Sequence, residues 1–215
     1  MTAAARPRLT VASIVDAALV VVDKEGVDGL TTTRVARELG VSQPTLYSHV
    51  ASLDEIRTAA ALRCAEAITI SVQAAVQGLD GDDALFAMAR TYRDYVRENP
   101  ERYLLALSSA HTDEYRTLTE HYAEAVRDVL RWYGLGEDEV VEAHLAFRAA
   151  VHGFVHLEAR DALPARVACP DDHFDFLIRV FAAGLRSLDT VRVDADRDVS
   201  ERRAAPRGSA PSGSG

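Results

Sequence analysis

Apolar residues recur at intervals of three and four positions along most of the chain, which is the spacing of one face of an α-helix. The first such run lies between Thr10, which can cap the start of a helix, and Gly26, which can end one. No segment shows the strict apolar–polar alternation of a half-buried strand. The pattern therefore predicts an all-α fold. The apolar positions of the first run are Val11, Ile14, Val15, Ala18, Leu19 and Val22.

The same spacing predicts a succession of helices separated by short breaks, in which glycine, proline or asparagine is prominent. From residue 189 the chain becomes charged, and it then becomes rich in Ala, Pro, Gly and Ser, a composition typical of disorder. Helices are expected over 11–25, 32–39, 42–50, 52–76, 82–98, 101–110, 113–133, 137–161 and 171–188.

The charge is distributed unevenly along the chain. The formal net charge is −9, which by itself disfavours a nucleic-acid partner. Residues 1–53, however, carry as many basic as acidic side chains, so the whole excess lies in 54–215. DNA is therefore expected to meet only the neutral N-terminal end. The charged side chains of that end are Arg6, Arg8, Lys24, Arg34 and Arg37, with Asp16, Asp23, Glu25, Asp28 and Glu38.

Neither cysteine chemistry nor a membrane segment is indicated. Cys64 and Cys169 are far apart and have no CxxC partner, which argues against a disulfide framework or a structural zinc site. The apolar run from Val11 to Val22 superficially resembles a signal peptide, but Asp16 interrupts it and no small-residue cleavage site follows. No stretch reaches the roughly 18 apolar residues that span a bilayer. We expect a cytoplasmic protein with no membrane partner.

The stretch from Leu30 to Val50 has the features of a helix-turn-helix. A first helix over 32–39 ends at Gly40, where a sharp turn favours a residue that tolerates positive φ. Ser42 can cap a second helix, and Pro44 falls in its first turn, where it breaks no helical hydrogen bond. The pattern predicts two helices joined by a tight turn.

The second of these helices is expected to have one buried and one polar face. Leu46 and Val50 are four residues apart, so both face inward. The outward face is then uncharged and rich in hydrogen-bonding groups, which suits a helix in the major groove of DNA. The outward residues are Gln43, Thr45, Tyr47, Ser48 and His49.

Each outward residue has an expected role on DNA. Gln43 can pair with the edge of an adenine, and the methyl group of Thr45 can contact that of a thymine. Tyr47, His49 and Thr33 are better placed for phosphates, which set register more than sequence preference. The alternative is a structural corner of an all-helical protein. The cap, the turn glycine, the inward pair and the polar outward face together favour DNA binding.

The segment from Thr10 to about Ile56 resembles the DNA-binding domain of the TetR family, and its helix-turn-helix is especially similar to that of the tetracycline repressor branch. Most members have a lysine at the start of the next helix that holds a phosphate, whereas this chain has Leu53. Arg6, Arg8 or Arg57 is a candidate to replace the missing charge. The resemblance implies that DNA is contacted by Thr33, Gln43, Pro44, Thr45, Tyr47, Ser48 and His49.

A second resemblance concerns the stretch 147–158, which is similar to a helix of a TetR ligand-domain subfamily named for a Trp-His-Gly motif. His152 and Gly153 match the motif, and Val151 stands in place of the tryptophan. The resemblance implies that this helix and the last one pack against their symmetry mates in a four-helix dimer interface. A homodimer would also read the second half-site of a palindromic operator, because one short recognition helix reads too few bases.

Aromatic residues concentrate between the DNA-binding end and these expected dimer helices. Two interpretations are open: most belong to the ordinary core, or some line a pocket in which phenol hydroxyls orient a mainly apolar effector. For the second interpretation the candidates are Tyr92, Tyr95, Tyr103 and His152. The full aromatic set is Phe86, Tyr92, Tyr95, Tyr103, Tyr122, Trp132, Phe147 and Phe154.

The sequence does not favour metal binding or catalysis. His152 and His156 lie one helical turn apart, a spacing that can bind a metal, but no adjacent cysteine or carboxylate completes a site. We find no nucleophile elbow, phosphate-binding glycine loop or acid–base pair. We therefore expect no enzyme, no metal and no cofactor.

Together these patterns and the resemblance predict a ligand-responsive regulator that a small-molecule effector of unknown identity releases from its operator. The resemblance implies a repressor, because repression is the commoner behaviour in that family. Residues 1–53 would be the helix-turn-helix DNA-binding domain, 54–188 the helical effector-binding and dimerisation domain, and 189–215 a disordered tail. The alternatives are an architectural DNA-binding protein without an effector and, less favoured, a small helical enzyme.

Overall fold

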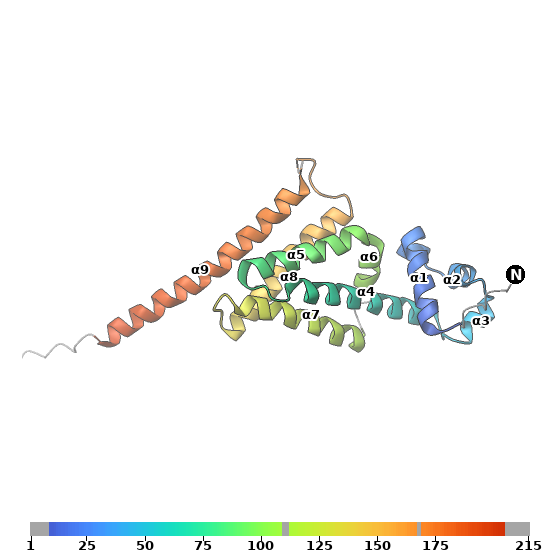
Figure 1. The fold of residues 1–215 in the computed structure, drawn as a ribbon, viewed down its shortest axis with the longest axis horizontal. Helices are drawn as coiled ribbons and strands as arrows, with labels where there is room; N and C mark the ends of the chain where they lie inside the picture. The colour runs from blue at the N-terminus through green and yellow to red at the C-terminus, as the bar shows by residue number, and fades with distance from the viewer. Residues whose placement is uncertain (1–8, 109–111, 167–168, 205–215) are drawn as a thin grey trace, which may run out of the picture.

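We describe a computed structural model of the chain over residues 9–108, 112–166 and 169–204, with side chains up to residue 188. Every regular element in these ranges is a helix, as the sequence predicts (Figure 1). The elements are α1 (Val11–Glu25), η1 (Val27–Gly29), α2 (Thr32–Leu39), α3 (Gln43–Tyr47), α4 (Leu53–Val76), α5 (Gly81–Glu98), α6 (Pro100–Ser108), α7 (Asp113–Arg131), α8 (Glu137–Ala159) and α9 (Pro170–Ala204).

Local capping explains where the first helices begin and end. The hydroxyl of Thr10 accepts a hydrogen bond from the backbone N–H of Ser13 at 3.1 Å, and the Ser13 hydroxyl accepts one from the N–H of Thr10 at 2.9 Å. Gly26 follows the last residue of α1 at φ +75°. Gly40 ends α2 in the left-handed conformation, with φ +65° and ψ +32°, where a side chain would add strain.

The buried residues form two separate cores. The first packs α1, α2, α3 and the first half of α4 together with Leu105 and Ala106 of α6. The second fills the body formed by the second half of α4 with α5, α7, α8 and the beginning of α9. In Figure 1, α4 leads from the small N-terminal group of helices into this body. The first core reaches Cys64, so it extends past residue 53, where the sequence places the domain boundary.

The apolar composition of α4 follows from its central position. By length and composition alone this helix resembles a membrane-spanning segment. In the structure α1, α5, α6 and α7 all contact it. Its buried residues are Ile56, Ala60, Ala61, Cys64, Ala65, Ile68, Thr69 and Val72. Packing inside a helical protein therefore accounts for its hydropathy.

The last helix is longer than predicted. The sequence places the start of a disordered tail at residue 189, but α9 continues to Ala204, so that prediction is wrong for 189–204. The chain from 189 to 204 contains no glycine or proline, and nothing in it ends a helix. Figure 1 shows this part of α9 extending away from the body. The remainder of the predicted tail, 205–215, lies outside the described residues.

A buried arginine joins three helices of the body. Arg93 of α5 is 4% exposed, and its guanidinium donates to both carboxylate oxygens of Glu158 in α8, at 2.6 and 2.8 Å. It also lies 2.8 Å from a carboxylate oxygen of Asp171 in α9. The rings of Phe154 and Phe174 cover it, with the guanidinium carbon 5.5 and 4.9 Å from their centroids. The charge is thus paired and enclosed.

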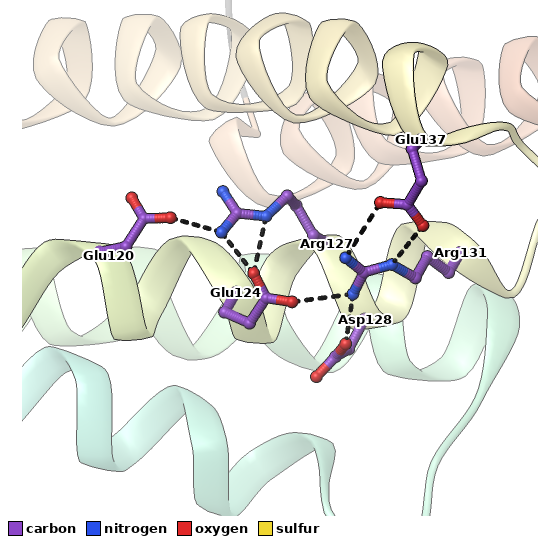
Figure 2. Close-up of polar contacts among 6 residues, drawn as sticks. All are labelled: Glu120, Glu124, Arg127, Asp128, Arg131 and Glu137. Atoms are coloured by element: carbon purple, nitrogen blue, oxygen red, sulfur yellow. Dashed lines mark hydrogen bonds and ion pairs between the residues drawn. The ribbon is translucent and has the colours of Figure 1, made fainter.

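An ion network on α7 reaches the start of α8 (Figure 2). Arg131 lies 2.9 Å from Glu124 and 2.6 Å from Asp128 of its own helix, and 3.2 Å from Glu137 of α8. Arg127 pairs with Glu124 and with a further glutamate one turn earlier. The carboxylates of this network are exposed, so each pair adds little stability. Its structural effect is to neutralise two arginines locally.

Candidate DNA-binding surface and ligand cavity

The expected recognition helix is short and anchored on one side. α3 ends at Tyr47, earlier than predicted, and the chain continues through a turn to Val50. Leu46 is fully buried and Val50 nearly so, which confirms the predicted inward pair. The Ser42 hydroxyl caps the helix by accepting from the N–H of Thr45 at 3.3 Å. The exposed residues of this segment include Pro44, Thr45, Tyr47, Ser48 and His49.

Gln43 is half-buried and is held against α2. Its amide nitrogen donates to the hydroxyl of Thr33 at 2.6 Å and to that of Thr32 at 3.3 Å. The hydroxyl of Tyr47 also points to Thr32, at 3.5 Å. The amide is therefore oriented before any ligand arrives. A bidentate pairing with adenine would require it to give up at least one of these bonds, because the amide nitrogen has only two hydrogens.

Among the described residues of the N-terminal end, 9–57, three of the four lysine and arginine side chains are already engaged. Lys24 pairs with Glu38 at 3.1 Å, and Arg34 pairs with Glu25 at 2.6 Å. Arg57 donates to the backbone oxygen of Leu30 at 3.2 Å, which leaves it poorly placed to replace a phosphate-binding lysine. Arg6 and Arg8, the other candidates for that role, lie outside the described residues.

Arg37 and Leu53 also affect the charge that the N-terminal end can offer to DNA. The exposed Arg37 has no ion-pair partner among the described side chains, so its guanidinium is available to a phosphate. Leu53, at the position where most TetR members have lysine, packs against the first core. An apolar contact thus stands where the family pattern has a charge.

A small cavity lies inside the body between α4, α5, α6, α7 and α8. Its volume is about 80 Å³. Rings and hydroxyls dominate its wall, and the one arginine among its lining residues comes from α8. The lining residues are Ala65, Ile68, Thr69, Tyr92, Tyr103, Ala106, Leu107, Tyr115, Thr119, Tyr122, Ala123, His144, Arg148 and His152.

Three of the four residues predicted for a ligand pocket meet in this cavity. The hydroxyl of Tyr92 lies 3.3 Å from Nδ1 of His152, with the two ring centroids 4.9 Å apart. Tyr103 packs edge-on against Tyr92 at a centroid distance of 6.4 Å. The geometry does not support the fourth residue, Tyr95, because its hydroxyl donates outside the cavity to the backbone oxygen of Cys64 at 3.4 Å.

The sequence-based candidates include none of the cavity residues of α7 and only His152 of those on α8. Tyr115, Thr119 and Tyr122 follow one another at intervals of four and three residues on α7, and all three line the cavity. His144, Arg148 and His152 do so at intervals of four on α8. Polar residues that recur at helical spacing lie on one face of a helix. These two sets of residues were therefore the sequence signal that could have indicated the cavity wall.

Burial shifts the proton affinity of the cavity's polar groups. It raises the pKa of Tyr92, Tyr103 and Tyr122, so these phenols stay protonated at neutral pH. Burial also lowers the pKa of His152 to about 4, and the nearby positive charge of Arg148 acts in the same direction. His152 is therefore uncharged in the folded protein at neutral pH.

This shift predicts an acid sensitivity. The unfolded chain binds a proton at residue 152 below about pH 6.5, whereas the folded chain does so only near pH 4. The stability of the folded state should therefore fall as the pH drops from 6.5 to 4, by up to about 3 kcal/mol from this group. In denaturant titrations at several pH values, His152→Gln should show a shallower loss than the wild type. His121→Gln, at an exposed site on α7, should keep the wild-type slope, and equal slopes for all three proteins would contradict the assignment.

A second hollow, a groove of about 920 Å³, runs between α8 and α9. Its lining includes the exposed apolar residues Val141, Val180 and Leu188. Leu145 of α8 and Phe176 of α9 are also exposed. These are the two helices for which the sequence resemblance implies a dimer interface. In the monomer, their apolar side chains are left facing solvent.

Among the described residues, no three His, Cys, Asp or Glu side chains are grouped so that they could hold a metal ion. His152 and His156 are each occupied with aromatic neighbours. His152 contacts Tyr92, and the ring of His156 lies 6.5 Å from that of Tyr103.

Known proteins share both the sequence and the fold. Residues 14–60 match the family of bacterial regulatory proteins called the tetR family, and residues 85–181 match the tetracyclin repressor-like C-terminal domain. The chain is 39% identical over 163 residues to the uncharacterized HTH-type transcriptional regulator Rv0681 of Mycobacterium tuberculosis, an alignment that covers 72% of each protein.

Two solved structures share the arrangement of helices. BioQ with its double-stranded DNA operator is 24% identical, with a TM-score of 0.64, over 83% of this chain and 99% of that one. A TetR variant of Acinetobacter baumannii in complex with minocycline is 23% identical, also with a TM-score of 0.64, over 84% of this chain and 98% of that one. From its family matches, its mycobacterial relative and this fold, the chain belongs to the TetR family of transcriptional regulators.

Proposed function

We propose that this regulator binds a palindromic operator as a homodimer, represses transcription there, and is released by a small-molecule effector that enters the cavity. The observation that carries this proposal is the position of α6, a short helix that belongs to both cores. Tyr103 of α6 lines the cavity, while Leu105 and Ala106 are buried in the first core with α1 and α4. One rigid element thus contacts both the effector cavity and the DNA-binding end.

Polar contacts strengthen the link between α6 and the DNA-binding end. The carboxylate of Glu101 accepts a hydrogen bond from the backbone N–H of Val27 at 3.0 Å. The guanidinium of Arg102 donates to both carboxylate oxygens of Asp23, at 2.8 and 2.7 Å. A shift of α6 would therefore be transmitted to α1 and η1, and through them to the recognition helix.

The size of the cavity supports a mechanism that requires movement. About 80 Å³ is well below the 300–1,000 Å³ of sites for drug-sized ligands. A ligand larger than a single small ring must push the surrounding helices apart. Tyr103 is part of the wall, so α6 is one of the elements displaced. Binding would then favour an arrangement in which the two recognition helices of a dimer no longer match the operator.

On DNA, the exposed end of α3 would enter the major groove. We assign base contacts to Gln43 and Thr45, and backbone contacts to Tyr47, His49 and Thr33. Pro44 and Ser48 complete the contact set. The support is the polar, uncharged exposed face of α3 on a buried anchor, together with the operator-bound BioQ structure of the same fold.

These roles predict different losses for two substitutions. Gln43→Ala should weaken binding to the operator by about tenfold or more, and should leave binding to random DNA nearly unchanged, because a base contact contributes only on the specific sequence. Tyr47→Ala should weaken binding to both DNAs by a similar factor, because a phosphate contact is independent of sequence. Fluorescence anisotropy on both DNAs measures the ratio. Equal losses on operator and random DNA for Gln43→Ala would remove its base-reading role.

The link through α6 has its own test. Arg102→Met removes the pair with Asp23 on the surface and leaves the cavity intact. A compound found by thermal-shift screening should bind this variant with the same affinity as the wild type. The concentration of compound needed to release the variant from operator DNA should nevertheless be several times higher than for the wild type. Lys24→Met breaks another exposed pair of α1 and should release normally. If the compound also releases Arg102→Met from operator DNA at the wild-type concentration, the contacts of α6 do not link the cavity to the DNA-binding end.

A further inference from the structure

We propose that the cavity takes a ligand with a flat apolar body and one negatively charged group, most simply an aromatic carboxylate, and that Arg148 holds the charged group at the cavity mouth. This inference rests on the proposed function, in which the cavity is the effector site. It adds the chemical class of the effector, which neither the fold nor the relatives specify.

The cavity wall carries a positive charge and no negative one. The lining residues include no aspartate or glutamate. Burial lowers the pKa of His144 and His152, so both are uncharged at neutral pH. Arg148 is then the one lining residue with a full charge, and the wall carries a net charge of one positive unit. In a chain with nine more acidic than basic residues, a wall without carboxylates selects against cations.

Among the described residues, Arg148 has no carboxylate to neutralise it. Several other arginines of the body are paired, among them Arg93 with Glu158, and Arg127 with Glu120 at 2.5 Å. Figure 2 shows Glu120 turned to Arg127. An arginine that faces a carboxylate-free cavity is ready to form a bidentate pair with an anion.

The field of Arg148 reaches into the cavity. Burial raises the pKa of Tyr115 and Tyr122, and the positive charge of Arg148 opposes that rise at both residues. It also adds to the lowering of the pKa of His144 and His152. At each group, Arg148 stabilises the more negative form. A ligand anion in the same place would be stabilised in the same way.

The rest of the cavity wall fits the flat apolar part of such a ligand. Tyr92, Tyr103 and Tyr122 present rings with centroid separations of 6.4 and 6.1 Å from the central Tyr92. Ile68 and Ala123 add aliphatic surface. Arg148 is exposed, so the bound charge remains near water and avoids the cost of burying an ion. The apolar part of the ligand would lie among the rings, and its charged group would lie at the mouth of the cavity.

The test compares 2-naphthoate with its uncharged counterpart 2-naphthamide. Calorimetry on the full chain should show the naphthoate binding about tenfold or more tightly than the naphthamide. Arg148→Gln should remove most of this preference by weakening the naphthoate alone. Arg160→Gln removes an exposed arginine from the same region without touching this cavity, and should keep the preference.

The possible outcomes separate this inference from the proposed function. Equal binding of the two probes, no binding of either, or an unchanged preference in Arg148→Gln would overturn the anionic class. Release of operator DNA by the naphthamide alone would also overturn it, while supporting the effector function. The expected preference without any release of operator DNA would support the anion site and count against the effector function.

Discussion

Val180→Glu is expected to give a folded monomer that binds the operator about a hundredfold or more weakly than the wild type. Val180 lies on α9, is 53% exposed, and lines the groove with Val141 and Leu188. The substitution costs the isolated chain little because the side chain is not in the core. In the proposed dimer it would place a charge in an apolar contact, which strongly opposes association. Without a partner, only one half-site is read at a time.

Light scattering after gel filtration gives the mass, and anisotropy gives the operator affinity. Ile70→Glu is the matched control, because Ile70 is an apolar residue with 59% exposure on α4, away from the groove. That variant should remain a dimer with wild-type affinity. A dimeric Val180→Glu with full affinity would show that the α8–α9 face is not the interface. A monomer with full affinity would show that dimerisation is not needed for operator binding.

Arg93→Met is expected to lower the free energy of unfolding by about 3 kcal/mol or more. The substitution keeps most of the apolar bulk but leaves the carboxylate of Glu158, which is 15% exposed, without its bidentate partner. It also removes the cation between Phe154 and Phe174 and one contact to Asp171. The start of α9 would then be held less firmly against α5 and α8.

The matched control is Arg90→Met, one turn earlier on the same helix. Arg90 also pairs with a carboxylate of α9, that of Asp175 at 2.6 Å, but its side chain is 53% exposed. Solvent screens that pair, so its loss should cost about 1 kcal/mol or less. Urea unfolding of both variants measures the difference. Equal costs for the two arginines would mean that enclosure of Arg93 adds nothing to its ion pairs.

The elements that the sequence predicts well are those decided by neighbouring residues. The caps at Thr10 and Ser42, the turn at Gly40 and the inward Leu46 depend on spacing within a few residues, and the structure has each of them. Composition misled the prediction for 189–204, where charge suggested disorder although no helix-breaking residue is present.

The cavity was only partly predictable because tertiary packing decides which side of a helix faces it. Tyr92 and Tyr95 are three residues apart on α5, and the sequence treats them alike. In the fold, Tyr92 faces His152 of α8, whereas Tyr95 faces Cys64 of α4. The proposed role of Arg148 in binding an anion could not be predicted either. An exposed arginine becomes a candidate only when the fold places it beside a cavity wall without carboxylates.

The central claim, that the chain recognises a two-fold symmetric operator through α3, is tested most directly by selecting DNA from a random library with the purified protein. Anisotropy at two salt concentrations then compares the selected DNA with a scrambled version. We predict an enriched palindrome bound about a thousandfold more tightly than the scrambled DNA, with a preference that persists at the higher salt. Failure to enrich any sequence, with equal and salt-sensitive binding to both DNAs, would contradict it.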